Sequence, residues 1–323
     1  MARIGFHASH EQFSPGELLD CARAAELAGF DCLMSSDHLA PWSERQGQSG
    51  FAWAWLGAAM QATSLPFGLI TVPSGWRYHP VVTAQAGATL AQMFPGRMAW
   101  LALGSGEALN ECMVGADWPE KPQRNERLFC GAQVIRSLWR GEEVTVAAPI
   151  PTRQAKLYTL ATRPPPLLGA ALSPETARWM GGWADGLLTV HRPLDDLRRL
   201  VDAFREGGGE NKPVHLQVHL SYAADEASAR SNALDQWHSN ALAADLTENL
   251  ATPAAFERAT ANVGPADMDA FVHISADAHI HAAWIERYAE MGFAEIYLHN
   301  VGRNQIEFIE AFGEKIKPLL SWT

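Results

Sequence analysis

Residues 67–106 read FGLITVPSGWRYHPVVTAQAGATLAQMFPGRMAWLALGSG, and this stretch decides the fold class. An apolar run at 67–72 is followed by a helical pattern at 80–94 and by a second apolar run that ends at the glycines. Strand, helix and strand in this order predict two parallel strands joined by a right-handed crossover. The stretch therefore predicts an α/β protein.

The same alternation extends along nearly the whole chain. Strands are predicted at 3–8, 31–36, 67–72, 97–106, 166–172, 186–191, 214–222 and 295–300. Eight such units favour a closed (β/α)₈ TIM barrel over an open doubly wound sheet. No GxGxxG follows the first strand, which weakens the dinucleotide-binding alternative.

Two segments depart from the repeat. Residues 141–166 contain EEVTVAAPIP and a PPP run, and we expect them to form an excursion from the barrel, with a hairpin as one possible form. Residues 224–269 are largely helical in pattern and read as an insertion after the seventh strand, at the mouth of the barrel. Neither segment looks like an interdomain linker, so we expect one domain spanning 1–323.

Composition excludes several classes of function. A net charge of −11 argues against nucleic acid or an anionic membrane as the main partner. No apolar run is long enough for a membrane span, and no signal peptide is visible, so we expect a cytoplasmic protein acting on a small molecule. The four cysteines lack CxxC spacing, which indicates neither a zinc site nor a disulfide framework.

Polar residues collect where the strands end, and in a barrel the active site lies at that end. His38 follows the second strand and Glu107 follows the fourth, so both can face one pocket across the third strand. A histidine takes up a proton near neutral pH, and a partly buried glutamate can hold or deliver one. Gly104 and Gly106 would let the backbone approach a planar ring. This pattern is typical of proton transfer around a redox step.

The segments SSDHLAPW (35–42) and LALGSGEALNE (101–111) resemble the bacterial-luciferase-like flavin and deazaflavin oxidoreductases. They look most like the branch that contains deazaflavin-dependent glucose-6-phosphate dehydrogenase. The similarity continues through WRYHPVVTAQAGATLAQMFPGR, GGWADGLLTV and WIERYAEMGFAEIYLHNVGRNQ, and so covers most of the chain. The resemblance implies a (β/α)₈ barrel with an insertion after strand seven.

The resemblance also implies roles for individual residues. His38 corresponds to the active-site base, and Glu107 to the acid that protonates the ring of the cofactor on reduction. Trp42 would line the substrate side, and we expect His191 and His299, at two strand ends, to bind substrate. The family often has a non-proline cis peptide at the end of strand three, which would fall here within 70–72.

Further positions are expected to bind the cofactor: Asp37, Thr71, Val72, Gly104, Ser105, Gly106, Asn110, Ala171, Ser173 and Thr176. Ser173 opens a predicted helix, whose N-terminus could receive a cofactor phosphate. An ordinary N-cap explains the same residue equally well.

The substrate and the cofactor are predicted from positions at which this sequence differs from the sugar-phosphate enzymes. The sugar-phosphate enzymes hold the phosphate with a Lys–His pair in the insertion and a Lys after strand six, but LTENLATP (246–253) and LTVHRPLDDL (188–197) contain no Lys. We therefore do not expect a phosphorylated sugar. The segments GFHASHEQF (5–13) and HNVGRNQ (299–305) resemble a sister group expected to use FMN. We predict FMN. The alternative is the deazaflavin coenzyme F420, with the protein then an F420-dependent alcohol or sugar dehydrogenase.

Several functions stay open. The enzyme could be a monooxygenase supplied by a flavin reductase, or a dehydrogenase that moves hydride to or from a small organic substrate. A metal-dependent hydrolase on the same barrel is a remote alternative, motivated by His7, His38, His191 and His299, but HASH is not the expected HxH. A flavin-binding protein without turnover is a third. We expect a homodimer, and GFAWAWLGAAM (50–60) is either its interface or core packing.

Overall fold

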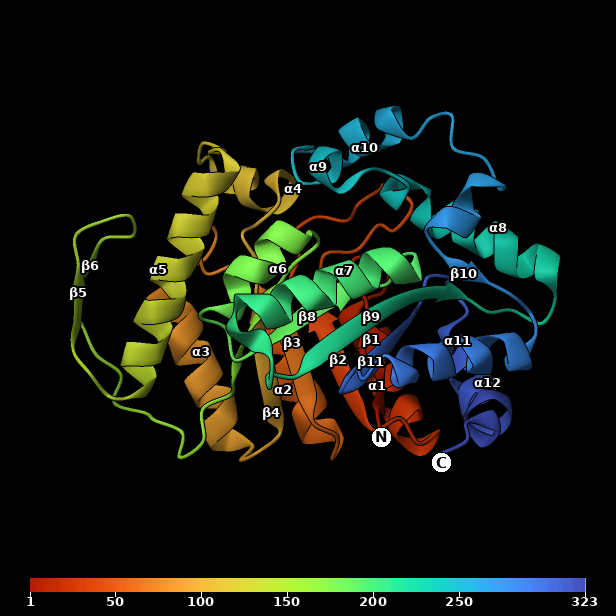
Figure 1. Cartoon of the computed structure of the whole chain (residues 1–323), viewed down its shortest axis with the longest axis horizontal. Helices are drawn as coiled ribbons and strands as arrows, with labels where there is room; N and C mark the ends of the chain where they lie inside the picture. Colours follow the sequence, from red (N-terminus) through yellow and green to blue (C-terminus); the bar gives the residue numbers. More distant parts are fainter. Residues whose placement is uncertain (323) are drawn as a thin grey trace.

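The computed structural model describes residues 1–322, and its centre is a closed barrel of parallel strands (Figure 1). The barrel strands are β1 (Arg3–Ala8), β2 (Cys32–Ser36), β3 (Phe67–Thr71), β4 (Met98–Leu103), β7 (Leu167–Ala170), β8 (Gly186–Val190), β9 (Val214–Ser221) and β11 (Glu295–Asn300). They pair in the order β9-β11-β1-β2-β3-β4-β7-β8, and the β8–β9 pairing closes the ring. The predicted eight-stranded barrel is confirmed.

Helices surround the barrel (Figure 1). They are α1 (Pro15–Leu27), α2 (Ala52–Ala62), α3 (Pro80–Met93), α5 (Lys121–Trp139), α6 (Pro174–Gly181), α7 (Leu194–Phe204), α11 (Ala278–Glu290) and α12 (Gln305–Ala311). The first begins where the sequence predicts it, because Ser14 and Glu17 form a reciprocal capping box and Pro15 occupies the first turn. Short 3₁₀ segments lie at Cys112–Val114, His238–Asn240, Asp267–Ala270 and Lys317–Leu319, and π-helical turns at Arg205–Gly209 and Phe312–Ile316.

The two irregular segments have defined structures. Between α5 and β7, the strands β5 (Val144–Val146) and β6 (Thr152–Ala155) form an antiparallel hairpin that extends away from the barrel at the left of Figure 1. After β9 come α8 (Glu226–Trp237), α9 (Ala244–Thr247), α10 (Pro253–Ala259) and β10 (His273–Ile274). The last pairs with the end of β9 as an additional parallel strand, which the sequence did not predict.

A buried polar cluster closes the end of the barrel at which the strands begin. The carboxylate of Glu295 is 2% exposed; it accepts a hydrogen bond from Trp100 Nε1 at 2.8 Å and lies 3.0 Å from His215 Nδ1. Trp100 fills the barrel interior so closely that a Cβ at Gly68 would come within 2.0 Å of its ring. Chemistry is therefore left to the opposite end, the barrel mouth, where the strands' C-terminal ends meet.

The apolar face of α2 packs inward. Trp53 and Trp55 are 9% and 4% exposed and belong to the main core, so their packing is explained without a partner chain. None of the helices within residues 1–322 is both long and apolar enough to cross a lipid bilayer.

Candidate active site

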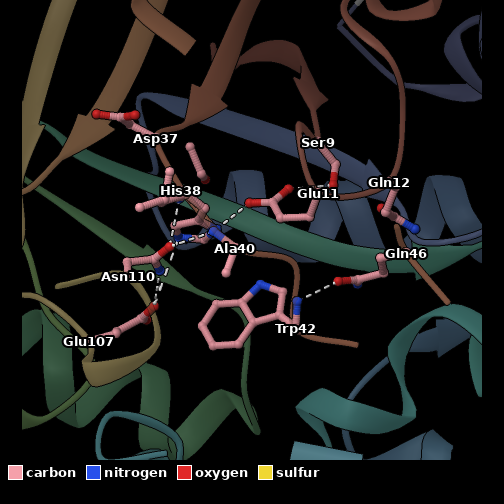
Figure 2. A network of polar contacts seen from close by, with 12 residues as sticks. Ser9, Glu11, Gln12, Asp37, His38, Ala40, Trp42, Gln46, Glu107 and Asn110 are labelled. Atoms are coloured by element: carbon pink, nitrogen blue, oxygen red, sulfur yellow. Dashed lines mark hydrogen bonds and ion pairs between the residues drawn. The ribbon is translucent and has the colours of Figure 1, made fainter. Parts of the chain in front are cut away.

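His38 and Glu107 face one another at the barrel mouth (Figure 2). His38 follows β2, and Glu107 is the N-cap of the short helix α4 (Ala108–Glu111) that follows β4. The Nε2 atom of His38 lies 3.9 Å from Oε2 of Glu107, and the two side chains are 21% and 30% exposed. Both groups are thus close enough to act on one substrate and remain open to it.

A third ionisable residue, Glu11, completes the group, and the sequence reasoning did not single it out. Glu11 lies in the loop after β1 and is 4% exposed. One carboxylate oxygen pairs with Nδ1 of His38, and the other accepts a hydrogen bond from Ser9 Oγ at 2.6 Å. Glu11 therefore holds the Nδ1 side of the ring and turns Nε2 toward Glu107 (Figure 2). The signal available in the sequence was an acid directly after HASH, at the end of the first strand.

The pKa values of these three groups follow from their neighbours. Burial alone lowers the pKa of His38, but the charge and hydrogen bond of Glu11, together with the Glu107 charge, raise it to about 8. Burial opposes ionisation of Glu11 as well, yet His38 and Ser9 bring its pKa down to about 2. Burial raises the pKa of Glu107, and the nearby imidazole opposes that shift only in part. At neutral pH the site thus holds a proton on His38 beside an ionised Glu11.

Asn110 links the loop after β2 to the segment after β4. Its Oδ1 accepts hydrogen bonds from the backbone N–H groups of Leu39 at 2.7 Å and Ala40 at 3.2 Å. Its Nδ2 donates to Glu107 Oε2 at 3.4 Å. Predicted as a cofactor-binding residue, Asn110 in this structure connects the loop that carries His38 to the helix that Glu107 caps.

Asp37 and Thr71 lie behind the site. The Asp37 side chain is fully buried and accepts hydrogen bonds from Thr71 Oγ1 at 2.8 Å and from Tyr78 at 3.2 Å, while Arg77 forms an ion pair with it at 3.3 Å. Figure 2 shows its carboxylate directed away from Glu107 and Trp42. Its contacts make Asp37 a support for the adjacent His38 loop.

Residues 104–106, between β4 and α4, carry no side chain larger than that of Ser105, and that a ring binds along them stays a prediction. Gly106 has φ +92°, and a Cβ there would come within 3.1 Å of the Trp118 ring, 3.2 Å of Glu111 and 3.3 Å of Val72. Gly104 has only distant neighbours, and Ser105 is 9% exposed. Within residues 1–322 the one cis peptide is Ala148–Pro149, so the expectation of a cis bond within 70–72 is wrong.

Ser173 is the N-cap of α6, one of the two roles that the sequence left open for it. Ser173 Oγ accepts a hydrogen bond from the backbone N–H of Thr176 at 3.2 Å, and the carbonyl of the buried Ala171 accepts one from Thr189 at 2.8 Å. Arg192, which follows β8, donates to the carbonyl of Leu172 at 2.7 Å. Its Nε is buried and has no hydrogen-bond partner in the part of the chain that the structure describes. A cationic group thus lies beside the N-terminus of this helix.

Trp42 forms an apolar wall next to His38. The two rings meet edge to face with centroids 5.2 Å apart, and Phe256 of α10 packs on Trp42 at 5.3 Å. Ala40, Leu109 and Phe256 complete a buried cluster around the indole. The insertion therefore supplies part of the wall of the barrel mouth.

His191 and His299 belong to a series of imidazoles in tilted and edge-to-face contact. His299 lies 4.4 Å from the ring of His7 and 5.5 Å from that of His219, which in turn lies 5.3 Å from His191. Burial lowers the pKa of His219 to about 3 and those of His191 and His299 well below their usual value. His299 is 1% exposed and bonds Gln12, so it lies deeper than a substrate contact would. Among residues 1–322 no three His, Cys, Asp or Glu side chains are placed to hold a metal ion.

Comparison with known proteins gives close relatives along the whole chain. F420-dependent glucose-6-phosphate dehydrogenase of Microbacterium testaceum (strain StLB037) is 36% identical over 98% of this chain and 97% of its own. The enzyme with the same description from Beutenbergia cavernae is 34% identical over 99% and 98%.

Solved structures agree in fold. An F420-dependent secondary alcohol dehydrogenase in complex with an F420–acetone adduct is 31% identical, with a TM-score of 0.89 over 98% of this chain and 99% of that one. The coenzyme F420-dependent tetrahydromethanopterin reductase of Methanopyrus kandleri, at 20% identity and a TM-score of 0.76 over 98% and 99%, shows the fold alone. The model of the family described as luciferase-like monooxygenase matches residues 1–295. The chain belongs to the luciferase-like monooxygenase family of oxidoreductases.

Proposed function

We propose that this protein is an F420-dependent dehydrogenase that interconverts a small uncharged alcohol and its carbonyl compound. The observation that carries the proposal is the arrangement Glu11–His38–Glu107, with Nε2 of His38 turned toward an acid 3.9 Å away. From the sequence we placed FMN first. The relatives favour our alternative, because the three reported above at 30% identity or more are all described as F420-dependent.

The residues at the barrel mouth fit a deazaflavin with an anionic tail. Residues 104–106 themselves carry no side chain larger than that of Ser105, which suits the approach of a flat ring to their backbone. Arg192, with an unpartnered Nε beside the first turn of α6, provides positive charge and N–H donors suited to a phosphate. These groups would hold the tail, while Gly106 and Val72 would lie against the ring.

When bound, the deazaflavin supplies a two-electron hydride acceptor. As hydride leaves the carbinol carbon, Nε2 of His38 takes the hydroxyl proton, so that the alcohol loses one hydride and one proton and becomes the carbonyl compound. In the reverse direction the protonated His38 returns the proton to the carbonyl oxygen. With a pKa of about 8, His38 is mostly protonated at pH 7, which favours carbonyl reduction.

Glu107 and Glu11 have separate tasks in this scheme. Burial raises the pKa of Glu107, so this side chain can hold a proton at the edge of the cofactor site. Glu11 stays ionised and fixes the ring of His38 by its pairing with Nδ1. The apolar wall of Trp42 and Phe256 suits an uncharged substrate, and neither 188–197 nor 246–253 supplies a lysine for a phosphate. A homodimer stays a prediction, and hydride taken from an alcohol needs no flavin reductase.

Binding of the two cofactors tests the proposal. The purified protein is titrated with F420 and, separately, with FMN, and each cofactor's fluorescence is followed. Acetone reduction by reduced F420 is then measured from the return of the absorbance of oxidised F420. We expect saturable F420 binding and turnover. Saturable FMN binding with no F420 binding would overturn the proposal.

A further inference from the structure

A cluster of one acid and two bases lies on the rim of the barrel mouth. Glu248, between α9 and α10, binds Lys121 Nζ through one carboxylate oxygen at 2.6 Å and Arg124 through the other at 2.8 Å. The Arg124 side chain is 3% exposed, Glu248 24% and Lys121 39%. The pairs are therefore partly withdrawn from water, where charge pairing matters more than on an open surface.

This cluster adjoins the catalytic acid. The backbone carbonyl of Glu248 accepts a hydrogen bond at 2.9 Å from the N–H of Ala108, the residue after Glu107. Burial is the main cause of the raised pKa of Glu107, and the negative charge of Glu248 makes a smaller contribution in the same direction. The guanidinium of Arg124 lies 4.4 Å from the ring centroid of Trp118, whose Nε1 donates to Asn249 at 3.0 Å. The insertion is thus fixed to α5 directly beside the proposed site.

The cations near Glu107 are bound by carboxylates. Arg77 contacts Asp37 and Glu111, at 3.3 and 3.6 Å, and Lys121 and Arg124 contact Glu248. An incoming phosphate would have to displace Glu248 from both bases. A neutral substrate would meet no such competition.

We infer that Glu248 is a specificity-determining residue, which excludes phosphorylated substrates by occupying Lys121 and Arg124. The part of the inference that concerns substrate choice rests on the proposed function. The structural part is that the Glu248 carboxylate occupies a site that would otherwise bind an anion. Without the carboxylate, two cations would remain at the rim. The Nε of Arg124 is already buried without a partner in residues 1–322, so the guanidinium has a free donor to offer.

Glu248→Gln tests this directly, because glutamine keeps the size of the side chain and removes the charge. The probe is inorganic phosphate, titrated calorimetrically into cofactor-free protein. We expect at least about tenfold tighter phosphate binding than in the parent protein, equivalent to about 1.4 kcal/mol. Glu142→Gln is the matched control, since Glu142 forms an exposed pair with Arg140 at 2.6 Å and should leave phosphate binding unchanged.

A second arm links binding to substrate choice. With oxidised F420 as the hydride acceptor, Glu248→Gln should raise kcat/KM for the oxidation of glucose 6-phosphate relative to that for the oxidation of isopropanol. Because the calorimetric arm needs no cofactor, it decides the role of Glu248 even if the proposed F420 activity fails. Folded Glu248→Gln protein that binds phosphate no better than its parent would overturn the inference.

Glu248→Asp covers the case in which the glutamine variant does not fold. Aspartate is one methylene shorter, so we expect it to reach only one of the two cations. The other cation is then left unpaired, while the negative charge at position 248 is kept. We expect phosphate affinity between those of the parent and the glutamine variant. No gain in the folded aspartate variant would equally overturn the inference.

Discussion

Nε2 of His38 lies 3.9 Å from Oε2 of Glu107, although two helices and two strands separate them along the chain. The parallel barrel brings them together, because the strands β2 and β4 end at the same mouth on either side of β3. Glu11 adds a second carboxylate on the other side of the imidazole. The account of function depends on this group of three.

Removing either proton-handling side chain should abolish most of the activity. We expect His38→Asn and Glu107→Gln each to lower kcat by about 10²- to 10⁴-fold, the range of general acid–base catalysis, in isopropanol oxidation with F420. F420 affinity, measured by fluorescence, should change much less for His38→Asn. His279→Asn, on the exposed face of α11, is the control. A loss below threefold in both site variants would contradict the assigned roles.

Glu11→Gln should move the pH profile. In the parent, carbonyl reduction needs protonated His38 and should fall as pH rises through about 8, while alcohol oxidation should rise. Without the Glu11 charge, burial lowers the pKa of His38, so both inflections should shift at least about one unit toward acid. Rates measured across pH in both directions check this. An unchanged inflection would show that Glu11 does not set the protonation of His38.

Asp37→Asn should destabilise the fold more than it disturbs chemistry. The Asp37 carboxylate is fully buried and is the nearer of two carboxylates paired with Arg77, whose buried charge would then have only Glu111, at 3.6 Å. The expected loss is about 1.5–3 kcal/mol in the free energy of unfolding, measured by urea denaturation. Asp20→Asn breaks an exposed pair with Arg23 and should cost below about 1 kcal/mol. Equal losses for the two variants would contradict the supporting role of Asp37.

The buried imidazoles should make the fold sensitive to mild acid. Burial holds the folded-state pKa of His7 near 4 and that of His219 near 3, below the unfolded value of 6.5, so the unfolded chain binds more protons in this window. The contribution of these two histidines to stability is complete above about pH 6.5 and falls as pH drops toward 4. The raised pKa values of Glu107 and Glu111 act in the opposite direction but are outnumbered. The pKa of His38, raised to about 8, adds stability that is present below pH 6.5 and is lost only as pH rises through 8, outside this window. A Tm that stays constant between pH 7 and pH 5 would contradict this.

The fold was predictable because its signals are local and repeated. Apolar runs such as 67–72 and caps such as Ser14–Glu17 specify strands and helices without knowledge of the rest of the chain. The approach of His38 to Glu107 followed from the same pattern, since parallel strand ends converge. The sequence was therefore enough to predict the barrel and the approach of His38 to Glu107.

The rest depends on contacts that no local pattern specifies. Glu11 is recognisable as a partner of His38 only once the loops after β1 and β2 are placed side by side. Thr71 and Asp37 stay predicted as cofactor contacts, and their hydrogen bond to each other is visible only in the folded structure. The two-residue strand β10 forms because the end of β9 is free to pair, and two residues are too few to give a periodic signal.

The most direct test is a single turnover with F420 and isopropanol that carries deuterium on its carbinol carbon. The account predicts reduction of F420 at a rate slowed by a primary isotope effect, with the deuterium recovered in the reduced cofactor, and loss of this reaction in His38→Asn. Absence of any F420 reduction, with isopropanol consumed only in the presence of FMN and oxygen, would contradict it.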